Sequence, residues 1–272
     1  MPDRSRGLTP VFEIRPSSSL PAPELAALFN RCYEGYFVPM QLDEAALAGM
    51  ARIFDLDLDA GLVALREGEP VGVVNLGVRG ERGWIGGLGV VADARREGTG
   101  RLLMEGVHEE ARSRGMDELV LEVIEANDPA FRLYEQLGYE MTRWLAIGSL
   151  EASEGDPPEQ TPGDEAHARI RAARTAPEPW QRDDGTLRHF DDLLGISTDT
   201  GAAVYRCGPD GSVTVQQFTG DAEAARAILT RLRALGRVNL FNIPQEDPLL
   251  EAATALGART ALRQREMTLS LQ

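Results

Sequence analysis

The chain has 272 residues, 43% of them hydrophobic and 26% charged, which is typical of a globular protein with room for two domains. Its formal net charge of −15 argues against nucleic-acid binding, because an acidic surface repels phosphate backbones. The sequence shows no signal-peptide-like start and no apolar run near the roughly 20 residues that span a bilayer, and its two cysteines and three histidines are too scattered for a disulfide framework or a metal site. We therefore expect a cytoplasmic protein that binds neither membrane nor nucleic acid and holds no metal.

The first half of the sequence alternates between strand and helix patterns. Short β-rich runs separated by glycine turns predict an antiparallel meander, and Gly115 and Gly138 stand where glycine ends helices. Asp43 stands where aspartate caps a helix. The predicted strands are residues 11–15, 62–66, 71–79, 84–91, 119–124 and 139–150, and the predicted helices are residues 22–32, 44–54, 100–114 and 128–137.

Residues 151–165 interrupt this alternation. The segment is acidic, contains prolines and has no apolar period, which is typical of an exposed linker. Beyond it the order of elements repeats, so we expect an internal duplication with domains at residues 1–150 and 166–272. The predicted elements of the second half are strands at 202–207, 213–218, 238–243 and 260–271 and helices at 221–234 and 248–256.

A polar loop between a predicted strand and a predicted helix carries the sequence R-x-x-G-x-G, formed by Arg95, Gly98 and Gly100. A helix start leaves several backbone N–H groups without partners, and its dipole favours an anion. Glycines let the backbone come close to a pyrophosphate, and Arg96 and Arg101 add positive charge. A solvent-exposed loop could carry the same residues, but the position between strand and helix favours a phosphate site.

A second glycine pattern, at residues 87–92, fits the dinucleotide-binding sequence G-x-G-x-x-A. It lies inside a predicted strand and no helix begins at Ala92, so we reject a nicotinamide or flavin site. Glycines within a strand mark a bulge or a close approach by another group. Here they are consistent with a ligand lying along the strand.

Two blocks of the sequence resemble the GNAT acyltransferase superfamily. The first is Val90–Leu103, which looks like the pyrophosphate loop and helix of that family. The second is Asn127–Tyr139, which matches the family pattern N-x-x-A-x-x-L-Y-x-x-x-G-[FY] at every position. The resemblance covers about residues 10–150 in the order of the elements.

The resemblance implies an α/β (α+β) fold of two tandem GNAT-like domains, each a mixed, mostly antiparallel sheet flanked by helices. Acetyl-CoA or another acyl-CoA, with no metal, would lie where the sheet opens between the strands at 84–91 and 119–124. The implied coenzyme contacts are Leu88, Gly89, Val90 and Asn127 for the arm, and Arg95, Arg96, Glu97, Gly98, Thr99, Gly100 and Arg101 for the pyrophosphate.

The sequence contains no nucleophile motif, so we expect the acceptor to attack the thioester directly, with the N–H of Val90 or Val91 stabilising the oxyanion. Tyr134 is the acid expected to protonate the leaving thiolate, because tyrosine has an ordinary pKa of about 10. It also shares an apolar helical stripe with Leu133 and Leu137, which is typical of a core residue. The surrounding motif favours the acid.

The general base stays open, because the strand at 84–91 contains no carboxylate. A base must take the proton that the acceptor loses, directly or through water. The carboxylates that the sequence offers are Glu122, Glu125, Asp93 and Glu34.

The resemblance implies an acceptor site at the loop after the first helix. Aromatic side chains there could wall a pocket or hold a cation over a ring, and they suit helix packing equally well. The residues assigned to this site are Tyr33, Tyr36, Phe37, Trp84 and Glu122.

The second half is similar to the family in outline only. The loop at 218–221, which would correspond to the phosphate loop, has no arginine and no paired glycines, and Ala253 stands where the first half has Tyr134. We therefore expect a degenerate domain without a working coenzyme site. The sequence leaves the oligomeric state open.

The expected activity is transfer of an acetyl group from coenzyme A to a primary amine of a small molecule or peptide. One alternative is a tandem acetyltransferase similar to mycothiol synthase, acting on a sugar-amine or thiol precursor. The other is an acyl-CoA-binding sensor or scaffold without turnover, which the missing base would favour.

Overall fold

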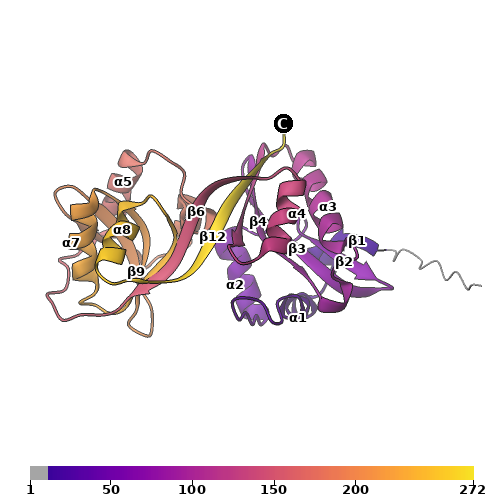
Figure 1. The fold of residues 1–272 in the computed structure, drawn as a ribbon, viewed down its shortest axis with the longest axis horizontal. Coiled ribbons are helices and arrows are strands. Elements are labelled where there is room, and N and C mark those ends of the chain that lie inside the picture. Colours follow the sequence, from indigo (N-terminus) through magenta and orange to yellow (C-terminus); the bar gives the residue numbers. More distant parts are fainter. Residues whose placement is uncertain (1–11) are drawn as a thin grey trace, which may run out of the picture. The chain divides into compact units, whose positions relative to one another are not determined.

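The structure is a computed structural model that describes residues 12–272, and Figure 1 draws its ribbon. Contacts group the chain into two compact units. The first comprises the residues up to Leu121 together with Gln136–Tyr139 and Thr268–Gln272, and the second comprises Glu122–Glu135 and Glu140–Met267. The domain boundaries predicted at residues 150 and 165 come from the repeated order of elements in the sequence, whereas these two units are defined by contacts. The predicted boundaries therefore stay a prediction.

In the first half of the chain, four antiparallel strands pair in sequence order and a fifth pairs with the last of them in parallel. The strands are β1 (Phe12–Pro16), β2 (Leu62–Arg66), β3 (Glu69–Arg79), β4 (Arg82–Val90), β5 (Glu118–Ile124) and β6 (Glu140–Leu150). The helices are α1 (Ala22–Cys32), α2 (Glu44–Phe54), α3 (Thr99–Ser113) and α4 (Asp128–Gln136), with the short 3-10 helices η1 (Ser17–Ser19) and η2 (Ala92–Ala94).

Local sequence signals set the ends of these helices. Asp43 caps α2 by accepting a hydrogen bond from the N–H of Ala46, which satisfies a donor that the helix start leaves unpaired. Gly115 follows α3 and Gly138 follows α4, and both have the positive φ that glycine adopts at low cost. The predicted start of the first strand, Val11, lies outside the described residues, and the other ends of the helices and strands predicted in this half are confirmed to within three residues.

The second half of the chain contains a similar series. Its strands are β7 (Thr161–Pro162), β8 (Leu194–Ser197), β9 (Ala202–Cys207), β10 (Val213–Thr219), β11 (Val238–Pro244) and β12 (Arg259–Ser270). Its helices are α5 (Gly163–Ala173), α6 (Asp184–Leu187), α7 (Ala222–Leu232) and α8 (Pro248–Ala255), with the 3-10 helix η3 (Trp180–Arg182). The sequence predicted no element between residues 166 and 201, and the stretch without regular structure ends before Thr161 rather than at residue 165.

The pairing pattern of the second half repeats that of the first. In each half a parallel pair is only three residues long, β4 with β5 at Arg82–Trp84 and β10 with β11 at Val213–Val215. In each half the outer neighbour of this pair, β3 or β9, is antiparallel and the ladder shifts register once. This shared arrangement supports the internal duplication that the sequence predicts.

The last strand of the chain takes part in both units. In the second unit β12 neighbours β6, as Figure 1 shows, and the N–H of Glu125 donates to the carbonyl of Arg263 at 2.9 Å. In the first unit the N–H of Leu271 donates to the carbonyl of Asp117 at 2.8 Å. Within residues 12–150 there is no seventh strand, and β12 takes that place in the strand order, between β5 and β6.

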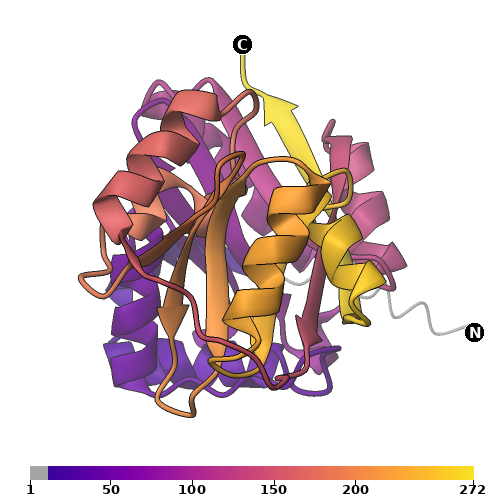
Figure 2. The ribbon, with the colours of Figure 1, turned by 90° about the vertical axis from the view of Figure 1, so that its left-hand side faces the viewer.

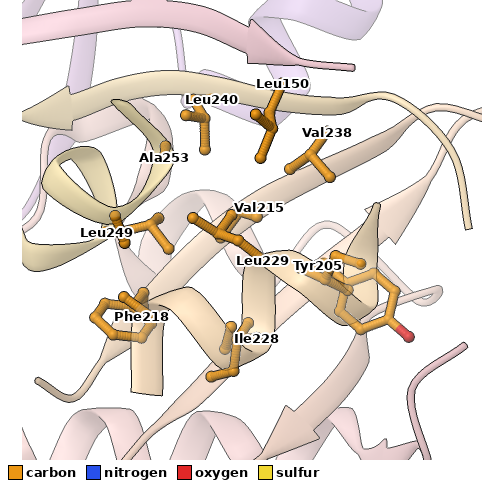
Figure 3. Close-up of a cluster of buried hydrophobic side chains, with 14 of the residues drawn as sticks. Leu150, Tyr205, Val215, Phe218, Ile228, Leu229, Val238, Leu240, Leu249 and Ala253 are labelled. Carbon is orange, nitrogen blue, oxygen red and sulfur yellow. The ribbon is translucent and has the colours of Figure 1, made fainter. Parts of the chain in front are cut away.

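A buried hydrophobic cluster holds the second unit together. Figure 2 shows α7 (orange) and α8 (yellow) lying together over one face of the strands, and Figure 3 shows Ile228 and Leu229 of α7 pointing into the cluster with Leu249 of α8. Leu150, from β6, belongs to the same cluster and is 1% exposed. A strand of the first half therefore contributes to the core of the second, because β6 pairs with β11.

Over residues 12–272 no helix is both long and apolar enough to cross a membrane. Over the same residues, His, Cys, Asp and Glu side chains form no group that could hold a metal ion.

Candidate functional site

The loop after β4 leads into α3 through Gly98, the residue at the N-terminal cap of the helix. Gly98 has a φ of 90°, and among the described residues no side chain caps the helix there. The N–H of Leu102 donates to the carbonyl of Gly98. The N–H groups of Thr99 and Gly100 precede this bond, so they belong to the turn that a helix leaves without intrahelical partners. Such a helix start suits an anion.

Arg66, on β2, restrains this loop. Its guanidinium contacts Asp93 at 2.9 Å and Glu97 at 3.1 Å, and it also donates to the carbonyl of Asp93. Thr99 adds a buried hydrogen bond from its hydroxyl to the carbonyl of Ala94. Asp93 and Glu97 are therefore engaged in holding the loop.

Two of the three arginines around the loop, Arg95 and Arg101, have partners within the protein. Arg95 donates to the carbonyls of Val90 at 2.9 Å and Cys32 at 3.1 Å. Arg101 donates to the side chain of Gln136 at 2.6 Å. Arg96 is exposed and has a left-handed backbone with a φ of 67°. The phosphate contacts expected of these side chains stay a prediction.

The sheet opens beside β4 after three residue pairs. The parallel ladder between β4 and β5 runs from Arg82 to Trp84, whereas β4 continues to Val90 on its other side against β3. In the described residues, the strand therefore has an edge without a ladder partner at Leu88, Gly89 and Val90. The N–H of Val91 donates to the carbonyl of Val71, so the expectation that it stabilises an oxyanion is wrong.

The glycines of β4 accommodate α1. A Cβ on Gly89 would lie 2.6 Å from the Cβ of Cys32, and a Cβ on Gly87 would lie 2.7 Å from the hydroxyl of Tyr33. The close approach predicted from these glycines is thus made, on this face, by the end of a helix rather than by a ligand. Burial raises the pKa of the Cys32 thiol to about 12, so the thiol is inert at neutral pH.

Three of the predicted acceptor residues lie together after α1. The rings of Tyr33 and Tyr36 are 5.0 Å apart between centroids, and those of Tyr36 and Phe37 are 5.2 Å apart. They adjoin a hollow of about 440 Å³ lined by Asn30, Arg31, Tyr33, Glu34, Gly35, Tyr36, Pro39, Met40 and Gln41. Trp84 packs elsewhere, against Phe54 at 5.5 Å, and is 6% exposed.

The second motif block places Asn127 and Tyr134 at the two ends of α4. Asn127 accepts a hydrogen bond from the N–H of Phe131 through its backbone and from that of Ala130 through its side chain, so it begins the helix. Tyr134 is the buried residue of α4, with 6% of its surface exposed. This burial is consistent with Tyr134 acting as the acid and also with Tyr134 being a core residue.

The four carboxylates considered as base differ in their surroundings. Glu125 is 45% exposed and contacts Arg263, and Asp93 is 73% exposed and contacts Arg66. Glu34 is exposed and lines the hollow beside the aromatic residues. Glu122, on β5, is half-buried with its Oε1 out of contact with solvent, and its Oε2 accepts a hydrogen bond of 2.9 Å from Gln181.

The sequence analysis missed Gln181 and Asn242. Gln181 lies 59 residues from Glu122 and carries no charge or motif that would single it out. Asn242 is fully buried and has a φ of 50°. A positive φ at a buried asparagine is a structural signal that no sequence pattern carries.

Comparison with known sequences matches the part of the chain that contains the loop and α3. The family model described as the Acetyltransferase (GNAT) family matches residues 10–139. A mycothiol acetyltransferase from Thermobifida fusca (strain YX) is 36% identical over 109 residues, which are 40% of this chain and 29% of that protein. The match thus spans less than a third of the length of that relative.

Comparison with solved structures extends the likeness to the whole chain. A GCN5-related N-acetyltransferase from Sphaerobacter thermophilus has a TM-score of 0.67 at 16% identity and covers 96% of each chain. A tandem GNAT protein from the clavulanic acid biosynthesis pathway has a TM-score of 0.60 at 15% identity, over 96% of this chain and 99% of that one. At these identities the comparison shows a shared fold, which is that of tandem GNAT proteins.

Proposed function

Residues 10–139 of this chain match the GNAT family, and we propose that the first half transfers an acetyl group from acetyl-CoA to a primary amine. The observation that carries the proposal is the start of α3. Backbone N–H groups without intrahelical partners, glycines at 98 and 100 and three arginines within one loop form a place where a pyrophosphate would be held.

The open edge of β4 supports the position of the coenzyme arm. Leu88, Gly89 and Val90 lie between the end of the parallel ladder and the loop. An extended amide-containing chain could hydrogen-bond to such an edge as an added strand would. The thioester would then lie toward the open end of the sheet.

Direct transfer requires two proton movements. The nitrogen of the amine attacks the thioester carbonyl carbon, the C–N bond forms, and the C–S bond breaks to release a thiolate. In the proposal the thiolate takes the proton of the Tyr134 hydroxyl, and the amine proton goes to a carboxylate. Tyr134 is buried, which limits competing protonation from bulk water.

We assign the base role to Glu122. It follows Val120, the last residue of β5 in the parallel ladder, by two positions, so it lies where the strands have separated. It is less exposed than Glu34 or Asp93, its Oε1 is buried, and its neighbour Gln181 is uncharged. Glu125 and Asp93, by contrast, are engaged with arginines.

The acceptor would enter at the aromatic residues after α1. The hollow beside Tyr33 and Tyr36 also contains Glu34, and a carboxylate among aromatic rings favours a cationic amine. The net charge of −15 acts in the same direction over longer distances. A small molecule or a peptide amine fits these features.

The test is loss of the thioester absorbance when acetyl-CoA is mixed with a panel of primary amines, comprising a polyamine, an amino sugar and a peptide with a free N-terminus. We expect turnover with at least one amine, and Tyr134→Phe should lower kcat about 100-fold or more with the affinity for acetyl-CoA unchanged. Tyr205→Phe, a buried tyrosine of the second half, is the matched control and should keep the wild-type rate.

Three results would change the proposal. Binding of acetyl-CoA without turnover on any amine would favour the sensor alternative. Turnover confined to the amino sugar would favour the alternative similar to mycothiol synthase, for which the 36% identity to a mycothiol acetyltransferase is the specific support. An unchanged rate in Tyr134→Phe would remove Tyr134 from the mechanism.

A further inference from the structure

The second half contains an opening in its sheet that its own chain fills. The parallel ladder between β10 and β11 ends at Val215 and Leu240. Just beyond it, Arg182 of η3 donates from Nε to the carbonyl of Gln216 at 2.7 Å and from Nη1 to the carbonyl of Asn242 at 3.2 Å. Arg182 is 1% exposed, so its guanidinium occupies the space between the separating strands.

The backbone on both sides of Gln181 is fixed by further hydrogen bonds. The carbonyl of Arg182 accepts from the side chain of Gln217 at 2.6 Å. The carbonyl of Trp180 accepts from the hydroxyl of Thr186 at 2.7 Å, and Trp180 is 2% exposed. Because the residues on both sides of Gln181 are buried and hydrogen-bonded, the backbone position from which its side chain extends is fixed.

The side chain of Gln181 lies in a chain of amides that all donate in one direction. Gln264 donates to Asn242 at 2.8 Å, and Asn242 donates to the Oε1 of Gln181 at 3.0 Å. Gln181 in turn donates from Nε2 to the Oε2 of Glu122 at 2.9 Å. Since the amide oxygens of Asn242 and Gln181 both accept within this chain, the NH2 group of Gln181 is turned toward the carboxylate.

We propose that Gln181 is a positioning residue that orients Glu122 and keeps it ionised as the base of acetyl transfer; this rests on the function proposed above. A carboxylate only accepts hydrogen bonds, so a donating chain of amides suits its charged form. The segment η3, which fills the opening in the sheet of the second half, therefore has a function in this proposal. It places Gln181 within hydrogen-bond distance of Glu122 on β5.

Charged groups on the neighbouring elements have other partners. Arg182 binds the two carbonyls and contacts Glu178 at 3.6 Å, and Glu266 of β12 binds Arg143 of β6. On the same strand β12, Arg265 donates to the carbonyl of Glu125 and lies over the rings of Phe131 and Trp144, and Arg263 contacts Glu125. Gln181 donates directly to the carboxylate of Glu122, so its removal should change the titration of that group.

The test measures the pKa of the Glu122 carboxyl by carbon-13 NMR on the full chain labelled at glutamate side chains, with the signal assigned by its absence in Glu122→Gln. Replacing Gln181 by methionine keeps the length and removes the donor, and we expect the pKa of Glu122 to rise by about one unit. Gln181→Glu should raise it further, because it adds a like charge. Gln264→Met, the same change two amides away, is the matched control and should have a smaller effect.

A second readout joins the pKa to catalysis. In the pH profile of kcat/KM, measured with an amine that the wild type acetylates, the fall in activity at low pH should move to higher pH in Gln181→Met. The move should equal the rise in the Glu122 pKa, with the affinity for acetyl-CoA unchanged. An unchanged Glu122 pKa in both Gln181 variants, with both folded by thermal unfolding, would overturn the positioning role. The NMR arm needs neither coenzyme nor acceptor, so failure of the enzyme proposal would be seen separately, as absence of turnover or of acetyl-CoA binding.

Discussion

The ionisable side chains in the core of the first unit act mainly through stability. His108, on α3, is 5% exposed and its Nε2 lies 3.0 Å from the hydroxyl of Tyr139. Burial, with a smaller effect from Arg112, lowers the pKa of His108 from its ordinary value of 6.5 to about 4. Between these two values the unfolded chain binds a proton that the folded chain does not.

This lowered pKa predicts a pH dependence. The contribution of His108 is fully present above pH 6.5 and is lost as the pH falls toward 4, by on the order of 1–3 kcal/mol. His108→Gln keeps a polar partner for Tyr139 and does not titrate. Urea unfolding at pH 7 and pH 4.5 should show a larger loss of stability for the wild type than for the variant, and equal losses would contradict the assignment.

Residue identity was sufficient to predict where glycines end helices and turn the chain, but not the partners of the side chains. The glycines at 98 and 138 mark positive φ values and could be predicted from sequence. The partners of Arg95, by contrast, are two backbone carbonyls, one of them on α1. A sequence gives no information on which carbonyl a long guanidinium side chain will reach.

At the scale of elements, the approach of β6 to the start of β12 depends on Gly148. A Cβ at this position would overlap the carbonyl oxygen of Arg259, and backbone cannot move away cheaply. Gly148→Ala should therefore lower the free energy of unfolding by about 1–3 kcal/mol, measured by urea denaturation. Gly155→Ala is the control, because the nearest atom is 3.8 Å away and its effect should stay within about 0.5 kcal/mol.

A Gly148→Ala protein as stable as the Gly155→Ala control would show that the two strands do not lie as described. Strand β6 would then have to be paired differently. The register of β6 with β11, from Leu145 to Leu150, would need revision as well.

Elements with a clear apolar period and a capping residue were predictable, and the others were not. Asp221 caps α7, which buries five residues along one stripe, and the helix was found. Helix α5 buries only Ala166 and Ile170 among charged neighbours, so its apolar period is weak. Segments as short as η3 and β7 have no periodicity to detect, and Gln181 lies in one of them.

For the whole molecule, the two halves of the sequence share strands. Strand β6 pairs with β11 of the second half, and the end of β12 belongs to the first unit. A fragment of residues 1–150 should therefore unfold at a lower temperature than the full chain, and adding residues 151–272 should restore it. Circular dichroism on the fragments, separately and mixed, gives the measurement, and a fragment 1–150 with the melting temperature of the full chain would contradict strand sharing.

The duplication could be predicted from the order of elements, whereas the sequence left open whether the missing seventh strand of the first half comes from the second half or is absent. Local sequence determines that residues 260–271 form a strand, whereas the choice of neighbour depends on which sheet edge is open. The edge beside β5 is open because the first half ends with β6, which pairs with β11. The neighbour of residues 260–271 is therefore determined by the tertiary structure and not by the local sequence.

In the proposed function the chain binds one coenzyme molecule, at the start of α3 in its first half. Calorimetric titration of acetyl-CoA into the wild type, Gly100→Glu and the control Gly155→Glu measures this binding. We expect one acetyl-CoA per chain for the wild type and the control, and no binding by Gly100→Glu, because a negative side chain would repel the pyrophosphate at the helix start. No binding by the wild type, two molecules per chain, or unchanged binding by Gly100→Glu would rule out this single site.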